Sequence, residues 1–257
     1  MKDITQLSQK DFFQWLKVQL ENRDFMSGWY LRKEKLWDEL YEILFYEQKL
    51  TVEDIEQFFI PFGQSGYLTP KLKFEIMLYV IEKDYGRSDL LLDGVESCCT
   101  ITGEDIDAIY LQWMTEDRLL LSDEEKKEFF IQCIMDNFGL GVLEVLGRAA
   151  KDGILIGELC PALHGQDKVE ERIAVRVNGM LVRLPFLAME NKEELIRIIK
   201  YAVAQENKGE LTVMEPILDF VREDGTCVTA VRPPAGKDWG IRILYGAARK
   251  EGVEWRR

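Results

Sequence analysis

The sequence of 257 residues contains a single histidine, His164, and no long apolar run. A Ser-His-Asp triad would have to use His164, but no Gly-x-Ser-x-Gly motif supplies the serine. A zinc site needs three or four ligands, and His164 has no ligand at a suitable spacing. We therefore predict no catalytic residue and no metal site. An enzyme that uses His164 with nearby carboxylates remains an alternative.

Disulfide and targeting signals are absent as well. The five cysteines are odd in number, scattered, and form no CxxC pair: Cys98, Cys99, Cys133, Cys160 and Cys227. Such a set indicates neither a disulfide framework nor a zinc site. No apolar signal segment follows Lys2-Asp3, and no run reaches the roughly 20 residues of a membrane span. These features predict a cytoplasmic protein, with Cys98-Cys99 as ordinary thiols and a redox pair as the alternative.

The sequence also lacks a P-loop, whose backbone amides and lysine wrap nucleotide phosphates. The nearest approach is Gly236-Lys237. Val231 stands where the first glycine would be, and Asp238 stands where Ser or Thr is needed. Gly139 and Gly141 follow no predicted strand and precede no Lys-Ser/Thr pair. We therefore predict no cofactor in this chain, and ATP only if a separate motor domain supplies its site.

Positive charge is scarce. The chain has 46 acidic and 33 basic residues, for a formal net charge of -13. Such a surface repels phosphate backbones, so we predict no nucleic-acid partner. The basic residues near the C-terminal end are expected to form a solvated tail, and a local basic patch is the alternative interpretation. They are Arg242, Arg249, Lys250, Arg256 and Arg257.

The pattern that is present divides the chain into a helical part, 1–118, and an α+β part, 119–257. Aromatic and aliphatic residues recur at helical spacing through the first part. Thr51 and Thr102 precede acidic first turns, which is typical of helix starts. In the second part, Ser122-Asp-Glu-Glu125 is a capping box for a helix that should end near Asn137. An apolar segment from Leu140 to Leu146 could form a short helix.

From Ile154 onward the period changes to that of strands. Asn178-Gly179 between two alternating runs predicts a two-residue hairpin, with Ile173, Val175, Val177, Met180, Val182 and Leu184 on one face. Asn191 should cap a helix that ends near Gly209. The sequence therefore predicts an α+β domain whose largely antiparallel sheet of hairpins is covered by helices.

A second hairpin is predicted at Asp224-Gly225. A two-residue loop there would pair Val221 with Val228, Phe220 with Thr229, and Leu218 with Val231. This register would put Leu218, Phe220 and Val231 on one face. Pro233 and Pro234 should end the second strand, because proline cannot donate to a sheet. A third short strand should follow through Trp239, Ile241 and Ile243.

Several short motifs follow one another in order between Leu121 and Leu244. They are Leu121-Ser-Asp-Glu-Glu125, Gly139-Leu-Gly-Val-Leu-Glu-Val-Leu146, Asp167-Lys-Val169, Asn178-Gly179, Glu194-Leu-Ile-Arg-Ile-Ile199, Pro216-Ile-Leu-Asp219, Asp224-Gly-Thr-Cys-Val228, Arg232-Pro-Pro234 and Ile241-Arg242. Their order and spacing resemble the N-terminal region of the CpaF-like ATPases of type II and type IV secretion and Tad-pilus assembly. The resemblance covers roughly half of the chain. The first 118 residues would then be a helical extension.

The resemblance implies a cytoplasmic hexamer, at most peripheral to the inner face of the membrane. Its partners would be a RecA-like motor domain or secretion platform proteins. It also implies nucleotide-contact candidates, Arg242 and Arg232, where Arg242 falls on the arginine of the family's Ile-Arg-Lys strand. Cys227 stands where the family has an arginine, and Ile243 where it has a lysine. A guanidinium at either candidate offers charge and bidentate reach to phosphate. Surface arginines at strand ends are the alternative.

Three functions follow. The chain could be the assembly and regulatory portion of such an ATPase, without catalysis of its own. It could be a degenerate paralogue, an adaptor that binds the ATPase or its membrane platform, as the loss of arginine at Cys227 suggests. The third is the unrelated small enzyme that uses His164.

Overall fold

The computed structural model describes residues 4–23, 33–93, 100–163, 165, 167–205 and 209–246. Contacts divide the chain into two compact units, 1–68 with 120–138 and 69–119 with 139–257. This grouping differs from the division at 118/119 that the sequence predicts. Residues 69–119 group with the sheet because of contacts between distant segments, such as the Phe74 and Phe186 rings, whose centroids lie 5.2 Å apart. Helical spacing carries no information about such pairings.

The first unit is built from helices alone in its described part. They are η1 (Ile4–Gln6), α1 (Gln9–Asn22), α2 (Lys33–Tyr41), the π-helical η3 (Glu42–Glu47), α3 (Val52–Phe58), η4 (Ser65–Tyr67) and α6 (Asp123–Phe138). Phe12, Phe59 and Phe130 pack together in its core, with ring centroids 5.0 to 6.3 Å apart. The capping box at Ser122 is confirmed. The Ser122 amide donates to Glu125 at 2.7 Å, and the Glu125 amide donates to the Ser122 hydroxyl at 3.4 Å.

The second unit combines helices with one sheet. Its helices are α4 (Pro70–Tyr85), η5 (Ser88–Leu92), α5 (Gly103–Thr115), α7 (Val142–Ala149), η6 (Val169–Glu171), η7 (Pro185–Leu187) and α8 (Lys192–Gln205). Thr102 caps α5 through a bond to the Asp105 amide, and the Asn191 side chain accepts from the Glu194 amide at 2.9 Å. These local helix starts agree with the sequence.

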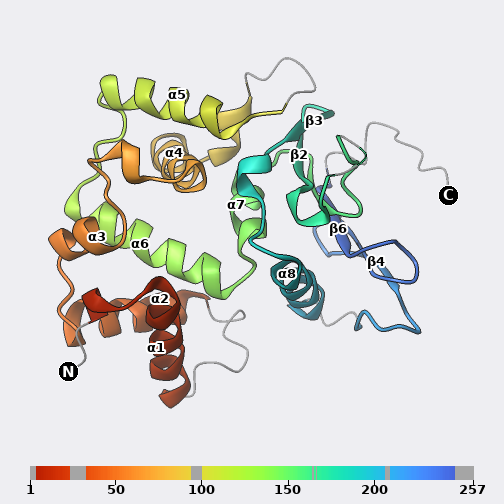
Figure 1. Ribbon diagram of the computed structural model, residues 1–257, viewed down its shortest axis with the longest axis horizontal. Coiled ribbons are helices and arrows are strands. Elements are labelled where there is room, and N and C mark those ends of the chain that lie inside the picture. Colours follow the sequence, from red (N-terminus) through yellow and green to blue (C-terminus); the bar gives the residue numbers. More distant parts are fainter. Residues whose placement is uncertain are drawn as a thin grey trace. The chain divides into compact units, whose positions relative to one another are not determined.

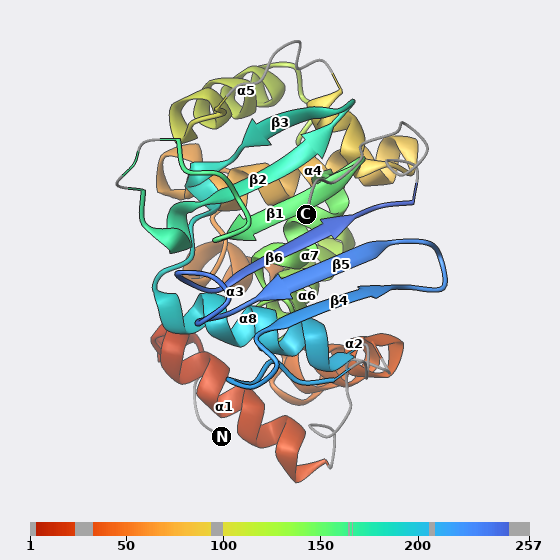
Figure 2. The ribbon, with the colours of Figure 1, turned by 90° about the vertical axis from the view of Figure 1, so that its right-hand side faces the viewer.

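The sheet has six strands, in the order β3-β2-β1-β6-β5-β4. They are β1 (Gly153–Gly157), β2 (Ile173–Val177), β3 (Met180–Arg183), β4 (Ile217–Val221), β5 (Cys227–Val231) and β6 (Gly240–Leu244). Every neighbouring pair is antiparallel. Figure 1 shows α7 and α8 on one side of this sheet, and Figure 2 shows its strands in order. The predicted α+β class, with helices over an antiparallel sheet, is confirmed. The sequence analysis did not place β1, which joins the two hairpins at the centre.

The register of the first hairpin is as predicted. Val177 pairs with Met180 and Val175 with Val182, so the loop is Asn178-Gly179. Both loop residues have positive φ, 52° and 77°, as a turn that follows the twist of the strands requires.

The predicted register of the second hairpin is wrong by one residue. Val221 pairs with Cys227, Phe220 with Val228, and Ile217 with Val231. The Arg222 amide donates to the Thr226 carbonyl at 2.8 Å, which leaves a three-residue loop, 223–225, with Gly225 at a φ of 84°. A glycine in this left-handed conformation closes the common three-residue loop as a bulge.

The one-residue shift moves side chains between the two faces of the sheet. Leu218 and Phe220 now share a face with Ala230 and Val228, whereas Val231 lies on the other face with Ile217. The face that α7 and α8 cover is apolar across all six strands. The opposite face carries arginines, and we call it the arginine face. It is defined by Arg176, Arg183, Arg242, Thr229 and Asp219.

Candidate functional site: the arginine face of the sheet

One row of paired residues crosses the arginine face from β3 to β4. It runs Arg183, Ala174, Leu155, Arg242, Thr229 and Asp219. Arg242 Nη2 donates to Thr229 Oγ1 at 3.1 Å, and that hydroxyl donates to Asp219 Oδ1 at 2.8 Å. The chain of bonds links a guanidinium, a hydroxyl and a carboxylate on three neighbouring strands. These bonds fix the direction of the Arg242 side chain, because the side chains of residues that pair across neighbouring strands stand side by side.

The second nucleotide-contact candidate, Arg232, lies elsewhere. It follows the end of β5, and its guanidinium carbon lies 4.9 Å from the centroid of the Trp239 ring. Its Nε donates to the Pro233 carbonyl at 3.2 Å, and its Nη1 donates to the Leu211 carbonyl at 3.3 Å. Lys200 of α8 also lies over the Trp239 ring, at 5.6 Å, so this cluster belongs to the helix-covered side. The structure therefore separates Arg232 from Arg242 by the thickness of the sheet.

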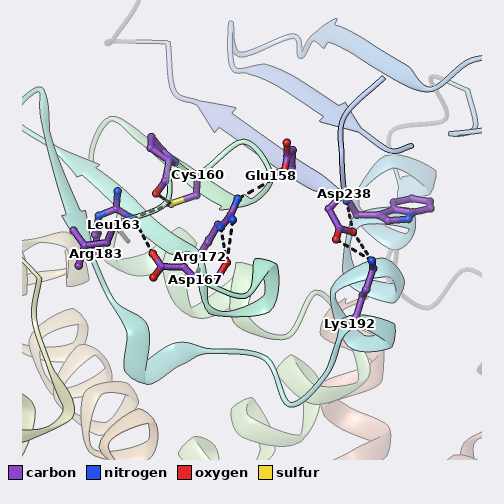
Figure 3. A network of polar contacts seen from close by, with 10 residues as sticks. Glu158, Cys160, Leu163, Asp167, Arg172, Arg183, Lys192 and Asp238 are labelled. Atoms are coloured by element: carbon purple, nitrogen blue, oxygen red, sulfur yellow. Dashed lines mark hydrogen bonds and ion pairs between the residues drawn. The ribbon is translucent and has the colours of Figure 1, made fainter. Parts of the chain in front are cut away.

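The loop between β1 and β2 covers the other half of the arginine face. Cys160 is buried there against Leu155 and Ala174, with Leu181 packed beside them. Arg172 donates to the Asp167 carbonyl at 2.9 and 3.2 Å and forms an ion pair with Glu158 at 3.6 Å. Figure 3 shows Glu158, Cys160, Asp167 and Arg172 in this loop region, with Arg183 next to Cys160.

Cys160 is not a prepared nucleophile. Burial raises the pKa of its thiol to about 11, although the nearby Arg183 guanidinium acts in the opposite direction. Arg183 Nη1 lies 3.8 Å from the sulfur. A reactive cysteine needs a lowered pKa and access to solvent, and Cys160 has neither.

Cys227, at the position of the family's arginine, lies half-buried on β5. Its Sγ is 3.8 Å from the Gly225 carbonyl. By register it faces Leu244 and Val221 on the arginine face. No charged group therefore stands at this position, next to the row that contains Arg242.

Several predicted features fall outside the described residues: His164, the Cys98-Cys99 pair, and the basic residues Arg249, Lys250, Arg256 and Arg257. Within the described ranges, no group of three or more His, Cys, Asp or Glu residues could hold a metal ion. In the same part of the chain, no single helix is long and apolar enough to cross a membrane. The consecutive helices α6 and α7 pass that test together, by length and composition only.

The sequence analysis missed Thr229 and Asp219 as partners of Arg242. The signal was present, since Asp219, Thr229 and Arg242 lie in three alternating strands. The one-residue error in the hairpin register concealed it, because that register pairs Phe220 with Thr229.

Comparison with protein-family models gave no match. A search of curated proteins gave no significant match either.

Proposed function

We propose that this chain is the assembly and regulatory portion of a CpaF-like secretion or pilus-assembly ATPase and does not hydrolyse ATP by itself. The observation that carries the proposal is the ordered motif series from Leu121 to Ile241-Arg242. The missing P-loop supports the proposal that the chain does not hydrolyse ATP by itself, because phosphoryl transfer needs backbone amides and a lysine around the phosphates.

The positions of the motifs in the second unit support the proposal further. Pro216–Asp219 runs from just before β4 into it, and Asp224-Gly225 lies in the loop between β4 and β5. Arg232 follows β5, and Ile241-Arg242 lies in β6. The motifs of the last third of the series thus belong to three adjacent strands. Arg242 is the better of the two nucleotide-contact candidates, because Arg232 already stacks on Trp239 and binds two carbonyls.

In this proposal the partners are further copies of the chain, in a hexamer, and a RecA-like motor domain. The protein would act in the cytoplasm, at the inner face of the membrane where platform proteins lie. An arginine contributed to a neighbouring nucleotide would stabilise the charge that develops on the phosphates.

The first test is the mass of the endogenous protein, captured with an antibody raised to this chain. We expect a mass larger than 29.9 kDa by a further domain, with peptides that contain Gly-x-x-x-x-Gly-Lys-Ser/Thr. A mass near 29.9 kDa would exclude this proposal in favour of the adaptor. If the chain is instead an adaptor, it should capture a P-loop ATPase in a pull-down.

The second test uses ATP turnover by the longer protein. Arg242→Gln should lower turnover at least tenfold, the size expected for loss of a charge-stabilising donor. Arg87→Gln is the matched control, because Arg87 is an exposed arginine that is paired with Asp89 and belongs to no strand. Equal turnover in both variants would remove Arg242 from the nucleotide site.

A further inference from the structure

Within the described residues, no strand pairs with the outer edge of β4. Strand β4 is the last of the sheet, and Figure 2 shows it as the outermost strand on its side. The other edge strand, β3, is partly covered, because Thr100 bridges to Arg183 and the Ile101 amide donates to the Arg183 carbonyl at 3.0 Å. No hydrogen bond from another described residue reaches the outer edge of β4.

The hydrogen bonds between β4 and β5 show which β4 residues have backbone amides and carbonyls that point to the outer edge. The Pro216 carbonyl accepts from Arg232, and the Arg222 amide donates to Thr226, so even-numbered residues bond to β5. In an antiparallel pair, bonding alternates along the strand. The amides and carbonyls of Ile217, Asp219 and Val221 therefore point outward, which gives an incoming strand three donors and three acceptors.

The same residues expose apolar side chains. Ile217 is 53% exposed and Val221 47%. Just before the strand, Val213 at 62% and Met214 at 89% stand at the tip of a tight turn, in which the Thr212 amide donates to the Glu215 carbonyl. Edge strands are usually blunted by charged side chains, especially lysine, by proline or by a bulge. Between Ile217 and Val221 the only such residue is Asp219, and Pro216 lies just before the strand.

The charge around this edge is negative. Between residues 209 and 232 five residues are acidic and two are basic, Arg222 and Arg232, of which Arg232 stacks on Trp239. The acidic residues are Glu210, Glu215, Asp219, Glu223 and Asp224. A second copy of β4 is a poor occupant. The antiparallel register that uses all three outward residues would place Asp219 opposite Asp219, and like charges directly opposite are destabilising.

We infer that the β4 edge, defined as Ile217–Val221 with the Val213-Met214 tip, docks an extended basic segment of a partner protein as a seventh, antiparallel strand. Side chains of that segment opposite Ile217, Asp219 and Val221 would be apolar, basic and apolar. Main-chain bonds would supply affinity and the alternating side chains specificity, as in other strand-addition complexes. This inference is independent of the proposed function.

The probe is an acetylated and amidated peptide of seven residues: threonine, valine, threonine, lysine, threonine, valine, threonine. Paired centrally, it places valine, lysine and valine opposite the three outward residues. Two control peptides have the same sequence with N-methylated backbone amides. In the first, both valines and the lysine are methylated, and in the second, the two threonines that flank the lysine are methylated. Both keep the charge, but only the first blocks the amides that would face β4.

Binding to the full chain is measured by amide chemical shifts and by fluorescence anisotropy of labelled peptide. We expect shifts concentrated on 217–221. We also expect at least tenfold weaker binding of the peptide methylated on valine-lysine-valine, and little change for the other. Ile217→Lys and Asp219→Lys should each weaken binding at least tenfold. Leu111→Lys should not, because Leu111 is as exposed, at 61%, but lies on α5.

Equal binding of the two methylated peptides would overturn the inference, since backbone pairing would not be involved. Shifts outside β4, or equal effects of Leu111→Lys and Ile217→Lys, would overturn it as well. A dimer in sedimentation that Ile217→Lys dissociates would also overturn it, by making the edge a self-association site. Circular dichroism of each variant guards against misfolding.

Discussion

Single residues in this protein are understood best where their partners are close in sequence. Thr51, Thr102 and Ser122 each begin a helix through a capping box, and each was visible as Ser or Thr followed three residues later by an acid. Residues whose partners are distant in the sequence could not be paired with those partners from the sequence. The sequence offered both Arg242 and Arg232 as nucleotide-contact candidates, yet one is bound to Thr229 and the other stacks on Trp239.

The first prediction at this scale concerns the Thr102 cap. Thr102→Ala removes the hydroxyl that accepts from the Asp105 amide at 3.2 Å. We expect a loss of about 1 kcal/mol in the free energy of unfolding, the usual cost of losing an N-cap. Urea unfolding measures it. Thr115→Ala, near the other end of the same helix, is the control, because the Thr115 hydroxyl bonds the Leu111 carbonyl and caps nothing. An equal loss of unfolding free energy in both variants would show that the Thr102 cap contributes no stability beyond that of an ordinary threonine in this helix.

The second concerns Cys160. Burial raises the pKa of its thiol to about 11, and alkylation requires the thiolate. At pH 8 iodoacetamide should therefore label the half-buried Cys133 and Cys227 well before Cys160, as mass spectrometry of peptides would report.

The raised pKa of Cys160 has a consequence for stability. The stabilisation from its neutral, buried thiol is fully present below the unfolded-state pKa of about 9 and is lost as the pH rises through about 11. The free energy of unfolding should fall over that range relative to Cys160→Ala. A difference between the two proteins that is independent of pH would contradict the assignment.

At the scale of elements, the two hairpins show how far turn chemistry reaches. Asn178-Gly179 forms the two-residue loop expected of it. Asp224-Gly225 forms part of a three-residue loop instead, because the Asp224 carboxylate accepts from the Thr226 amide at 2.8 Å and Gly225 alone takes the left-handed conformation. Both dipeptides signal a turn, but only the contacts across the strands distinguish the loop lengths.

This predicts different effects for glycine substitutions. Gly225→Ala should cost about 1–2 kcal/mol, because alanine is strained at a φ of 84° even though the site has space for a methyl group. Gly63→Ala is the control, since its φ is not in that region and nothing lies within 4 Å of the added carbon. It should be neutral or slightly stabilising. Thermal unfolding followed by circular dichroism compares the two, and similar melting temperatures would contradict the left-handed assignment.

At the scale of the whole molecule, two compact units are interleaved along the chain, so that each is made from two segments. Each unit has its own buried core. Leu16 is completely buried in the first, and Ile156 in the second. Contacts define the units, and we expect these cores to open separately.

Hydrogen exchange can test that expectation. Leu16→Ala should destabilise the first unit by about 2–5 kcal/mol, through lost burial and a cavity. Amides of α1, α3 and α6 should then exchange faster, while those of β1 and β6 stay protected. Ile156→Ala is the matched change, and it should give the reverse pattern. Equal acceleration in both units for either variant would show that the chain unfolds as one cooperative structure.

The sequence by itself determined the elements of this protein: where helices begin, that two hairpins exist, and that helices cover an antiparallel sheet. These features depend on capping, turn residues and periodicity, which act over a few residues. The tertiary structure alone decided three matters. It grouped 69–119 with the sheet and placed Arg242 and Arg232 on opposite faces. Among the residues that the structure describes, it also left the outer edge of β4 without a partner strand. Each depends on contacts between segments distant in the chain, and a single sequence does not encode these contacts in any local pattern.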